Sequence, residues 1–436
     1  MIGFVSFRKE TVLNYYLAVD IGASSGRHIV GWKEDGELKT EEVFRFPNGV
    51  KELDGHLTWD IDALFSNVKA GIAEAKKHFG DIFCMSIDTW GVDYVLLKGD
   101  ETVYPCYAYR DKRTEDVIPL VHGIVPFEEL YAHTGIQYQP FNTIYQLYCD
   151  KLAGRLEGVT DFLMVPEYLM YRLTGVKKHE YTNATTGGFI NAKARDYDRE
   201  ILAKLGLPAE LFGEISMPGT CVGEYEGIKV VLCPTHDTAS AVEGLPLPDG
   251  AMFLSSGTWY LLGMKLAQPE TSEKSRKANF TNAGGVGYIR YLQNIMGLWI
   301  IQNLQKMLGI SFGEMVDLAR SSSYEKLFDV NLPCFLEPFH IREDILRELG
   351  ETELSDADVI NSVYRSLAYS YGQAVRELEE ATGKAPEYLY IGGGGAKNQY
   401  LNELTEKYTG KKVVALPIEA TALGNLKIQM ESCPEK

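Results

Sequence analysis

The chain of 436 residues is longer than the size at which a single hydrophobic core stops growing, so two domains are expected. Its hydrophobic content of 45% and charged content of 24% are ordinary for a globular protein, and no apolar run approaches the ~20 residues of a membrane-spanning helix. The net charge of −17 argues against nucleic-acid binding, which depends on Lys and Arg neutralising phosphates, but it does not exclude a small anion held by backbone N–H groups.

The first predicted strand, residues 16–21, runs directly into a turn of small residues. Asp20 lies at the end of this strand, and the turn at 22–26 leaves its backbone N–H groups open to a phosphate. Similar turns follow strands at 255–257 and 392–395. None of them is a Walker loop or a dinucleotide-binding fingerprint, and each alone is common in α/β proteins for steric reasons. Together the three turns predict one nucleotide held between two halves of the chain.

The first half of the chain alternates between strand and helix signals. Asp35-Gly36 is a turn signal that predicts a hairpin. Asp60 is a possible N-cap for a long helix with apolar residues at helical spacing. In chain order the predicted elements are strands 16–21, 27–32 and 42–46, helix 59–79, strand 82–87, helices around 117–121, 143–152, 167–173 and 199–205, and strand 230–233.

A stretch rich in Pro and Gly, residues 244–250, predicts a boundary between domains 15–244 and 245–436. The second half opens as the first does, with a strand, a small-residue turn and another strand. This weak internal repeat is typical of two related α/β domains around a cleft. The predicted elements are strands 251–254 and 260–264 and helices 295–308 and 357–382.

Two carboxylate-bearing turns are candidates for chemistry. Asp237 follows a buried strand just before the predicted boundary, where a cleft wall is expected, but it could equally cap the next helix. The segment DTWGVD at 88–93 could likewise be a plain strand-to-loop turn. We expect Trp90 to pack in the core and Arg110 to Arg113 to be solvated charge.

Seven motifs occur in the order typical of the FGGY carbohydrate kinases, and the chain resembles that family from about residue 15 to 430. The loop at 88–93 is most similar to that of members that phosphorylate L-rhamnulose. The motifs are DIGASSGR at 20–27, DTWGVD at 88–93, PTHDTASA at 234–241, SSGTW at 255–259, NIMGLW at 294–299, four glycines at 392–395 and EATALGN at 419–425.

The resemblance implies an α/β fold of two ribonuclease-H-like (actin-like ATPase) domains with the active-site cleft between them. The N-terminal domain would be the sugar-binding side and the C-terminal domain the nucleotide-binding side. The implied reaction moves the γ-phosphoryl group of ATP to O1 of L-rhamnulose, with ATP and Mg²⁺ as cofactors.

The resemblance also implies roles for single residues. A sugar hydroxyl has a high pKa, so a carboxylate must accept its proton, and Asp237 matches this general base. Asp20 matches the acidic residue that faces Mg²⁺, usually through water. The matched sugar contacts are Gly91, His236, Asp237, Thr238 and Asn294. The matched nucleotide contacts are Ala23, Ser24, Ser25, Gly26, Arg27, Thr258, Gln302, and Gly394 or Gly395.

Two alternatives stay open. Another FGGY kinase could act on a different ketose or deoxy sugar, such as fuculose or xylulose, and a panel of ketoses would separate these. A non-catalytic actin-like sensor of sugar or nucleotide is the other alternative, although a sensor has no need of a general base such as Asp237.

Partners and location follow from composition. The seven cysteines lack C-x-x-C spacing and are odd in number, as expected of reduced thiols, and the first residues lack the features of a signal peptide. We therefore expect a cytoplasmic protein, a monomer or small homo-oligomer, that binds sugar and ATP and neither nucleic acid nor membrane.

Overall fold

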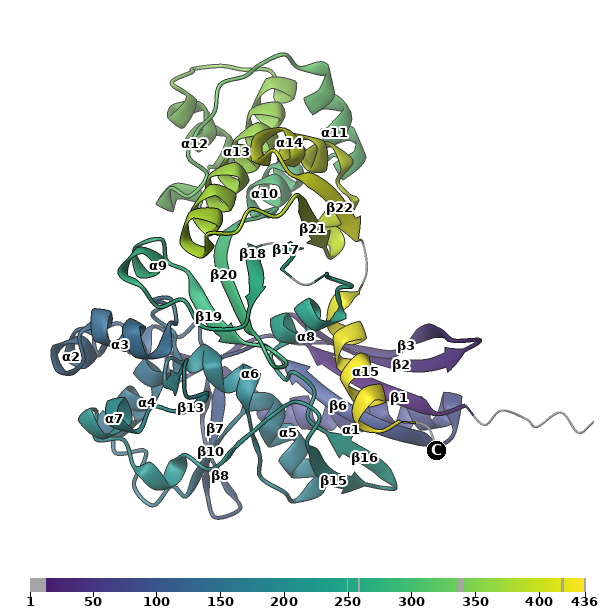
Figure 1. Cartoon of the computed structure of the whole chain (residues 1–436), viewed down its shortest axis with the longest axis vertical. Helices are drawn as coiled ribbons and strands as arrows, with labels where there is room; N and C mark the ends of the chain where they lie inside the picture. Colours follow the sequence, from purple (N-terminus) through teal and green to yellow (C-terminus); the bar gives the residue numbers. More distant parts are fainter. Residues whose placement is uncertain (1–12, 249, 258, 336–339, 417–418, 435–436) are drawn as a thin grey trace, which may run out of the picture.

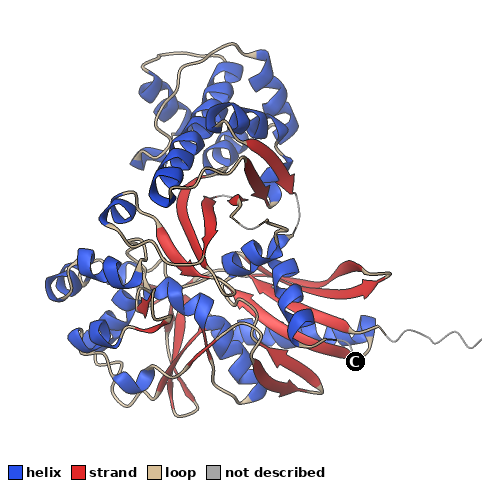
Figure 2. Ribbon diagram, viewed as in Figure 1, coloured by secondary structure: helices blue, strands red, loops and turns tan. Residues whose placement is uncertain are grey.

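The computed structural model describes residues 13–248, 250–257, 259–335, 340–416 and 419–434. Two six-stranded sheets organise these residues into two lobes, which lie one above the other in Figure 1. Figure 2 shows that the upper lobe is mostly helical and that long strands run from it towards the lower lobe. The expected two-domain α/β architecture is confirmed.

The first sheet has the order β15-β16-β6-β1-β2-β3. β1 pairs antiparallel with β2 and parallel with β6. The predicted hairpin is confirmed, because β2 and β3 pair antiparallel and both turn residues, Asp35 and Gly36, have a positive φ, of 52° and 81°. The strands are β1 (Tyr15–Ile21), β2 (Ser25–Glu34), β3 (Glu37–Pro47), β6 (Ile82–Thr89), β15 (Cys221–Tyr225) and β16 (Ile228–Val231).

The second sheet, of order β19-β20-β18-β17-β21-β22, repeats this pairing. β17 pairs antiparallel with β18 and parallel with β21, as β1 does with β2 and β6. The internal repeat seen in the sequence therefore corresponds to a repeated sheet pattern. The strands are β17 (Met252–Ser256), β18 (Trp259–Leu266), β19 (Thr281–Gly284), β20 (Ile289–Met296), β21 (Tyr388–Gly392) and β22 (Lys412–Leu416).

Two helix boundaries differ from the sequence prediction. The helix predicted to begin at 59 begins at Ile61, because Trp59 ends a short strand; Asp60 is its N-cap and accepts from the Ala63 N–H at 2.9 Å. The helix predicted over 295–308 begins at Trp299, because Ile295 pairs with Tyr260 in the sheet. In both cases strand pairing overrides a continuous helical pattern.

The other elements cover the sheets or join them. In the first lobe they are β4 (Lys51–Leu53), β5 (His56–Trp59), α1 (Ile61–Phe79), β7 (Tyr94–Lys98), β8 (Glu101–Val103), β9 (Cys106–Tyr107), α2 (Ile118–Ile124), α3 (Phe127–Thr134), α4 (Thr143–Leu152), β10 (Asp161–Met164), α5 (Val165–Thr174), β11 (His179–Glu180), α6 (Tyr181–Ala184), β12 (Ile190–Asn191), β13 (Asp196–Tyr197), α7 (Arg199–Lys204) and β14 (Ile215–Ser216). In the second lobe they are α9 (Glu273–Lys277), α10 (Trp299–Leu308), α11 (Phe312–Ser321), α12 (Ile341–Leu349), α13 (Asp356–Thr382) and α14 (Gln399–Thr409). Across the described residues, no helix combines the length and apolar character needed to cross a membrane.

Two helices connect the lobes. α15 (Ala420–Ser432) follows the second sheet in sequence but packs against α8 (Asp237–Gly244) and against β1 and β6 of the first sheet (Figure 1). The two helices touch through glycines, because a Cβ on Gly424 would lie 1.8 Å from the Ser240 carbonyl oxygen and one on Gly244 would lie 1.9 Å from the Ala420 carbonyl oxygen. Only glycine allows so close a contact of two backbones.

Candidate active site

A cavity of about 250 Å³ lies between the lobes, large enough for a single small ligand. The predicted sugar contacts Gly91, His236, Thr238 and Asn294 all line it, and Asp237 lies between two of them in the chain. These residues come from the end of β6, the start of α8 and β20. The structure therefore brings together residues that lie more than two hundred positions apart in the sequence.

The cavity is lined by both apolar and polar side chains. Apolar side chains make up much of the wall, while a smaller number of polar groups converge on it. The apolar lining residues are Trp90, Val92, Ile136, Phe141, Leu261, Ala283 and Leu292. The polar ones include Gln137, Gln139, Thr186, His236, Arg290 and Asn294.

Backbone pairing places Asp237 beside the end of β6. The Thr89 N–H donates to the Thr235 carbonyl oxygen at 2.9 Å, and Thr89 forms an isolated parallel bridge with His236. Asp237 is the first residue of α8, whose N-cap is His236, so Asp237 does not occupy the cap position considered from the sequence. Its Oδ1 accepts instead from the N–H and hydroxyl of Thr238, at 2.5 and 3.1 Å.

The surroundings of Asp237 suit a general base. Burial between the lobes raises the pKa of its carboxyl to about 6, and the charge of Asp20 adds to this effect. The side chain is nevertheless 31% exposed, so a substrate can reach it. A carboxylate with this pKa is ionised at neutral pH and is a stronger base than an ordinary Asp.

Asp20 and Asp88 form a buried pair at the end of the first sheet. They are directly opposite each other on the parallel strands β1 and β6. Burial raises the pKa of Asp88 well above its usual range, the charge of Asp20 raises it further, and burial likewise raises the pKa of Asp20. Oδ2 of Asp88 accepts from Asn425 of α15 at 2.6 Å, whereas its Oδ1 has no hydrogen-bond partner among the described residues.

Asp20 also forms an ion pair with Arg27 across the first small-residue turn. Arg27 donates from Nη2 to Oδ2 of Asp20 at 2.8 Å and from Nη1 to Glu419 at 2.7 Å. Asn48 holds the turn itself, with its side-chain amide 2.8 Å from the Gly22 carbonyl oxygen. Ser24 is exposed at the tip, and Ala23, Ser25 and Gly26 flank it.

The other two small-residue turns lie side by side in the second sheet. Ser255 is opposite Gly392 on parallel strands, and the Ser256 hydroxyl donates to the Gly392 carbonyl oxygen at 2.5 Å. A Cβ on Gly395 would lie 2.9 Å from the Ser256 Cβ, whereas one on Gly394 would meet open space. Gln302 lies on α10, and Thr258 falls outside the described residues. Of the predicted nucleotide contacts that the structure describes, none lines the cavity.

The sequence did not single out Asp93, whose side chain makes hydrogen bonds to several residues around the cavity. Asp93, which is 1% exposed, accepts at Oδ2 from the indole N–H groups of Trp59 and Trp90, at 2.6 and 2.9 Å. It also accepts from the Tyr109 N–H at 3.0 Å and, at Oδ1, from Gln146 at 3.1 Å. Trp90 is buried against Trp59, as expected of a core residue, but it also lines the cavity. The signal was present in the sequence as the last residue of DTWGVD.

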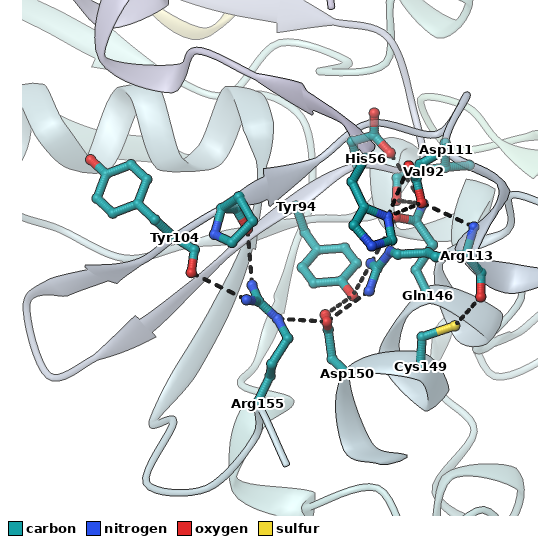
Figure 3. Close-up of polar contacts among 12 residues, drawn as sticks. His56, Val92, Tyr94, Tyr104, Asp111, Arg113, Gln146, Cys149, Asp150 and Arg155 are labelled. Atoms are coloured by element: carbon teal, nitrogen blue, oxygen red, sulfur yellow. Dashed lines mark hydrogen bonds and ion pairs between the residues drawn. The ribbon is translucent and has the colours of Figure 1, made fainter. Parts of the chain in front are cut away.

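A second polar network is joined to Asp93 through Gln146, whose side-chain amide donates to Asp93 at 3.1 Å; Figure 3 shows this network around Asp150. Arg113 donates to Asp150 at 2.7 Å and to Gln146 at 3.3 Å, and Arg155 and Tyr94 also donate to Asp150. The prediction that Arg113 is solvated charge is therefore wrong. Its side chain is only 10% exposed because it pairs with a carboxylate that is itself 1% exposed.

The comparisons with known proteins agree with this architecture. Residues 15–229 match the N-terminal domain of the FGGY family of carbohydrate kinases and residues 252–433 match its C-terminal domain. A rhamnulokinase of Halalkalibacterium halodurans is 41% identical over 96% of this chain and 93% of its own length. A rhamnulokinase of Bacillus subtilis is 37% identical over 96% of this chain and 90% of its own.

Solved structures show the same fold at low sequence identity. Xylulose kinase from Rhodospirillum rubrum superposes with a TM-score of 0.80 at 17% identity, covering 97% of this chain and 91% of that one. Plasmodium falciparum glycerol kinase with ADP gives a TM-score of 0.79 at 14% identity, covering 96% and 90%. Together with the two matched domains and the full-length relatives, this establishes that the chain belongs to the FGGY family of carbohydrate kinases.

Proposed function

We propose that this kinase transfers the γ-phosphoryl group of ATP to O1 of L-rhamnulose, giving L-rhamnulose 1-phosphate and ADP, as a step of L-rhamnose catabolism. The observation that carries this proposal is the position of Asp237, between two residues that line the inter-lobe cavity and with its pKa raised to about 6. The rhamnulokinases that are 37% and 41% identical to the chain support the choice of sugar.

The chemistry of the cavity favours a deoxy ketose. L-rhamnulose carries a methyl group at C6, where most ketohexoses carry a hydroxyl. Apolar side chains such as Val92, Ile136 and Leu261 can receive that methyl group, while Thr238 and Asn294 can bond hydroxyls. Xylulose carries the same number of hydroxyls but lacks the C6 methyl group, so it would leave this apolar part of the wall unfilled, a difference worth about 1–3 kcal/mol. Fuculose also carries the methyl group and is therefore the alternative substrate that this cavity discriminates against least.

In the proposed mechanism, Asp237 accepts the proton of the O1 hydroxyl as that oxygen attacks the γ-phosphorus. The N–H of Gly22 closes the first turn by donating to the Ser25 carbonyl oxygen at 2.9 Å. We propose that this turn and the turns of the second sheet offer their remaining backbone N–H groups to the phosphates. We propose that the chain divides at 244–250 and that the lobes close there, because water in the site would hydrolyse ATP.

The pair of Asp20 and Asp88 fits a magnesium ion brought in with the nucleotide. Two buried carboxyls repel each other, and Oδ1 of Asp88 has no partner among the described residues. Hard oxygen donors are what Mg²⁺ prefers, usually with several waters retained. When bound, the ion would neutralise negative charge on the phosphates. We propose that Asp20 faces it through water and that Asp88 supports Asp20.

A coupled assay of ADP release tests the reaction. We expect L-rhamnulose to give the highest kcat/KM in a panel with L-fuculose and D-xylulose, and little ADP to form without sugar. A higher kcat/KM for either competitor would identify another ketose kinase. ADP release that no ketose stimulates would favour the sensor alternative.

Replacing Asp20 with Ala tests the magnesium site. We expect the Mg²⁺ concentration for half-maximal rate to rise by about 10-fold or more, because water-bridged carboxylates tune metal affinity by ~10–100-fold. Titration calorimetry should show almost unchanged affinity for L-rhamnulose. A large loss of sugar affinity would place Asp20 in the substrate site instead.

Glu419→Gln is the matched control for Asp20→Ala. It removes the other partner of Arg27 and leaves Asp20 in place. If both variants shift the Mg²⁺ dependence equally, the effect passes through Arg27 and not through the metal.

A further inference from the structure

Arg290 is an unusual residue for a strand interior. It lies on β20, is 0% exposed, and lines the inter-lobe cavity. Its Nε donates to the Gly284 carbonyl oxygen at 2.6 Å, and its Nη2 donates to Nδ1 of His236 at 3.2 Å. Its Nη1 has no hydrogen-bond partner among the described residues. A residue that lines the cavity thus carries one buried donor without a partner among the described residues.

Arg290 also lacks a close counter-ion. Within the described part of the chain it forms no ion pair, and the carboxylates of Glu180 and Asp237 act on it only at longer range. Burial lowers its pKa to about 10, so the side chain still carries its charge at neutral pH. Burying an unpaired charge is expensive, so buried charges are normally paired, and one whose bonding is incomplete calls for an explanation such as a role in binding.

The contact with His236 fixes the proton of that imidazole. A guanidinium can only donate, so Nδ1 of His236 must accept and its Nε2 must carry the hydrogen. Burial and the charge of Arg290 lower the pKa of His236 well below its usual range, which keeps the ring neutral. Nε2 lies 3.4 Å from Oδ1 of Asp237, the oxygen that also accepts from Thr238.

We propose that Arg290 is a substrate-binding residue, whose Nη1 donates to a carbonyl or hydroxyl oxygen of the sugar while its Nη2 holds His236 in the tautomer that faces Asp237. This proposal adds a sugar-binding residue to the proposed function. It depends on that function only for the assumption that a ketose binds in this cavity. The second lobe thereby contributes a charged donor to the sugar, alongside Asn294 from the same strand.

A purely structural Arg290 would behave differently from a ligand-binding one. If it mainly joined the lobes, its loss would destabilise the ligand-free protein. If its unused donor serves the sugar, its loss should weaken sugar binding, while the stability of the ligand-free protein changes little, because removing a buried unpaired charge offsets the loss of the hydrogen bonds to Gly284 and His236.

The test compares Arg290→Met with the wild type in ketose binding by titration calorimetry and in melting temperature without ligand. We expect the Kd for L-rhamnulose to rise about 10- to 100-fold, the loss expected for a hydrogen bond from a charged donor. The ligand-free melting temperature should change little, because the gain from removing a buried unpaired charge offsets the two lost hydrogen bonds, and the KM for ATP should change little. Arg290→Lys, which keeps the charge but loses the forked donors, should weaken binding by an intermediate amount.

Arg365→Met is the matched control. Arg365 is half-buried on α13, pairs with Glu325 at 2.9 Å and does not line the cavity. We expect it to leave sugar affinity unchanged.

Three results would overturn the proposal. The first is an unchanged sugar Kd in Arg290→Met. The second is a loss of kcat with an unchanged sugar Kd, which would mean that Arg290 donates to the phosphoryl group instead of the sugar. The third is a large fall in the ligand-free melting temperature of both Arg290 variants. If the wild type prefers another ketose, the proposed function fails but the same comparison is made with that ketose. If no ketose binds the wild type, both proposals fail.

Discussion

Replacing Asp237 with Asn should lower kcat with L-rhamnulose by about 10²–10⁴, the usual contribution of a general base. Asn keeps the shape of the side chain, and its amide oxygen can still accept from Thr238 at the start of α8. It removes the capacity to accept the proton from the sugar O1. The sugar Kd and the KM for ATP should change far less than kcat, which stopped-flow and calorimetric measurements can separate.

The pH dependence gives an independent check on Asp237. Because its pKa is raised to about 6, the base is protonated and inactive below that pH, and kcat/KM of the wild type should rise as pH increases through about 6. Asp237→Asn should lose this rise. A variant that keeps near-normal kcat but melts at lower temperature would show that Asp237 only stabilises α8.

Asp60→Ala is the matched control for that alternative. Asp60 is a true N-cap, accepting from the Ala63 N–H at 2.9 Å, and it lies outside the cavity. Its loss should cost ~1 kcal/mol of stability and leave kcat unchanged. The two Asp variants therefore separate the loss of a cap from the loss of a base.

The features that sequence predicted were local ones. A buried strand followed by small residues identifies β1 and its turn, and the Asp35-Gly36 signal identifies the β2–β3 hairpin, because turn chemistry depends on a few neighbouring residues. Asp20 and Asp237 were recognised for a similar reason, since Asp20 lies at the end of β1 and Asp237 lies a short way after β16, as the first residue of α8. Their proximity to one another became visible only in the folded chain.

The features that sequence missed depend on contacts between distant segments. Arg290 lies in a strand that continues without a break towards a helical pattern, and nothing near it in sequence shows that His236 will be its partner. Arg113 looked solvated because its partner, Asp150, lies on another element. The packing of α15 against β1 and β6 of the first sheet is also a contact between distant segments. The residues of α15 alone predict only that it is a helix.

The contact of α15 with α8 leads to a prediction about stability. In an exposed helix, Gly→Ala normally stabilises by up to ~1 kcal/mol. At Gly424 the new Cβ would lie 1.8 Å from the Ser240 carbonyl oxygen, a backbone atom that cannot rotate away. We expect Gly424→Ala to destabilise by about 1–3 kcal/mol, measured as a lower melting temperature.

Gly123→Ala is the control with the opposite expected sign. Gly123 is exposed in α2, and a Cβ there would meet no described atom within 4 Å, so this change should raise the melting temperature slightly. Equal effects of the two changes would contradict close packing of α15 on α8.

Gly424→Ala should also reduce activity, because α15 contacts the candidate site. Asn425, the next residue, donates to Asp88 at 2.6 Å, and Glu419, just before the helix, pairs with Arg27 at 2.7 Å. Moving the helix away from α8 shifts both contacts, and a ~1 Å displacement of groups that position a reaction can cost ~10² in rate. We expect kcat to fall by about 10-fold or more at a temperature where the variant is still folded. A destabilised variant with normal kcat would show that α15 supports the fold without positioning the acidic pair.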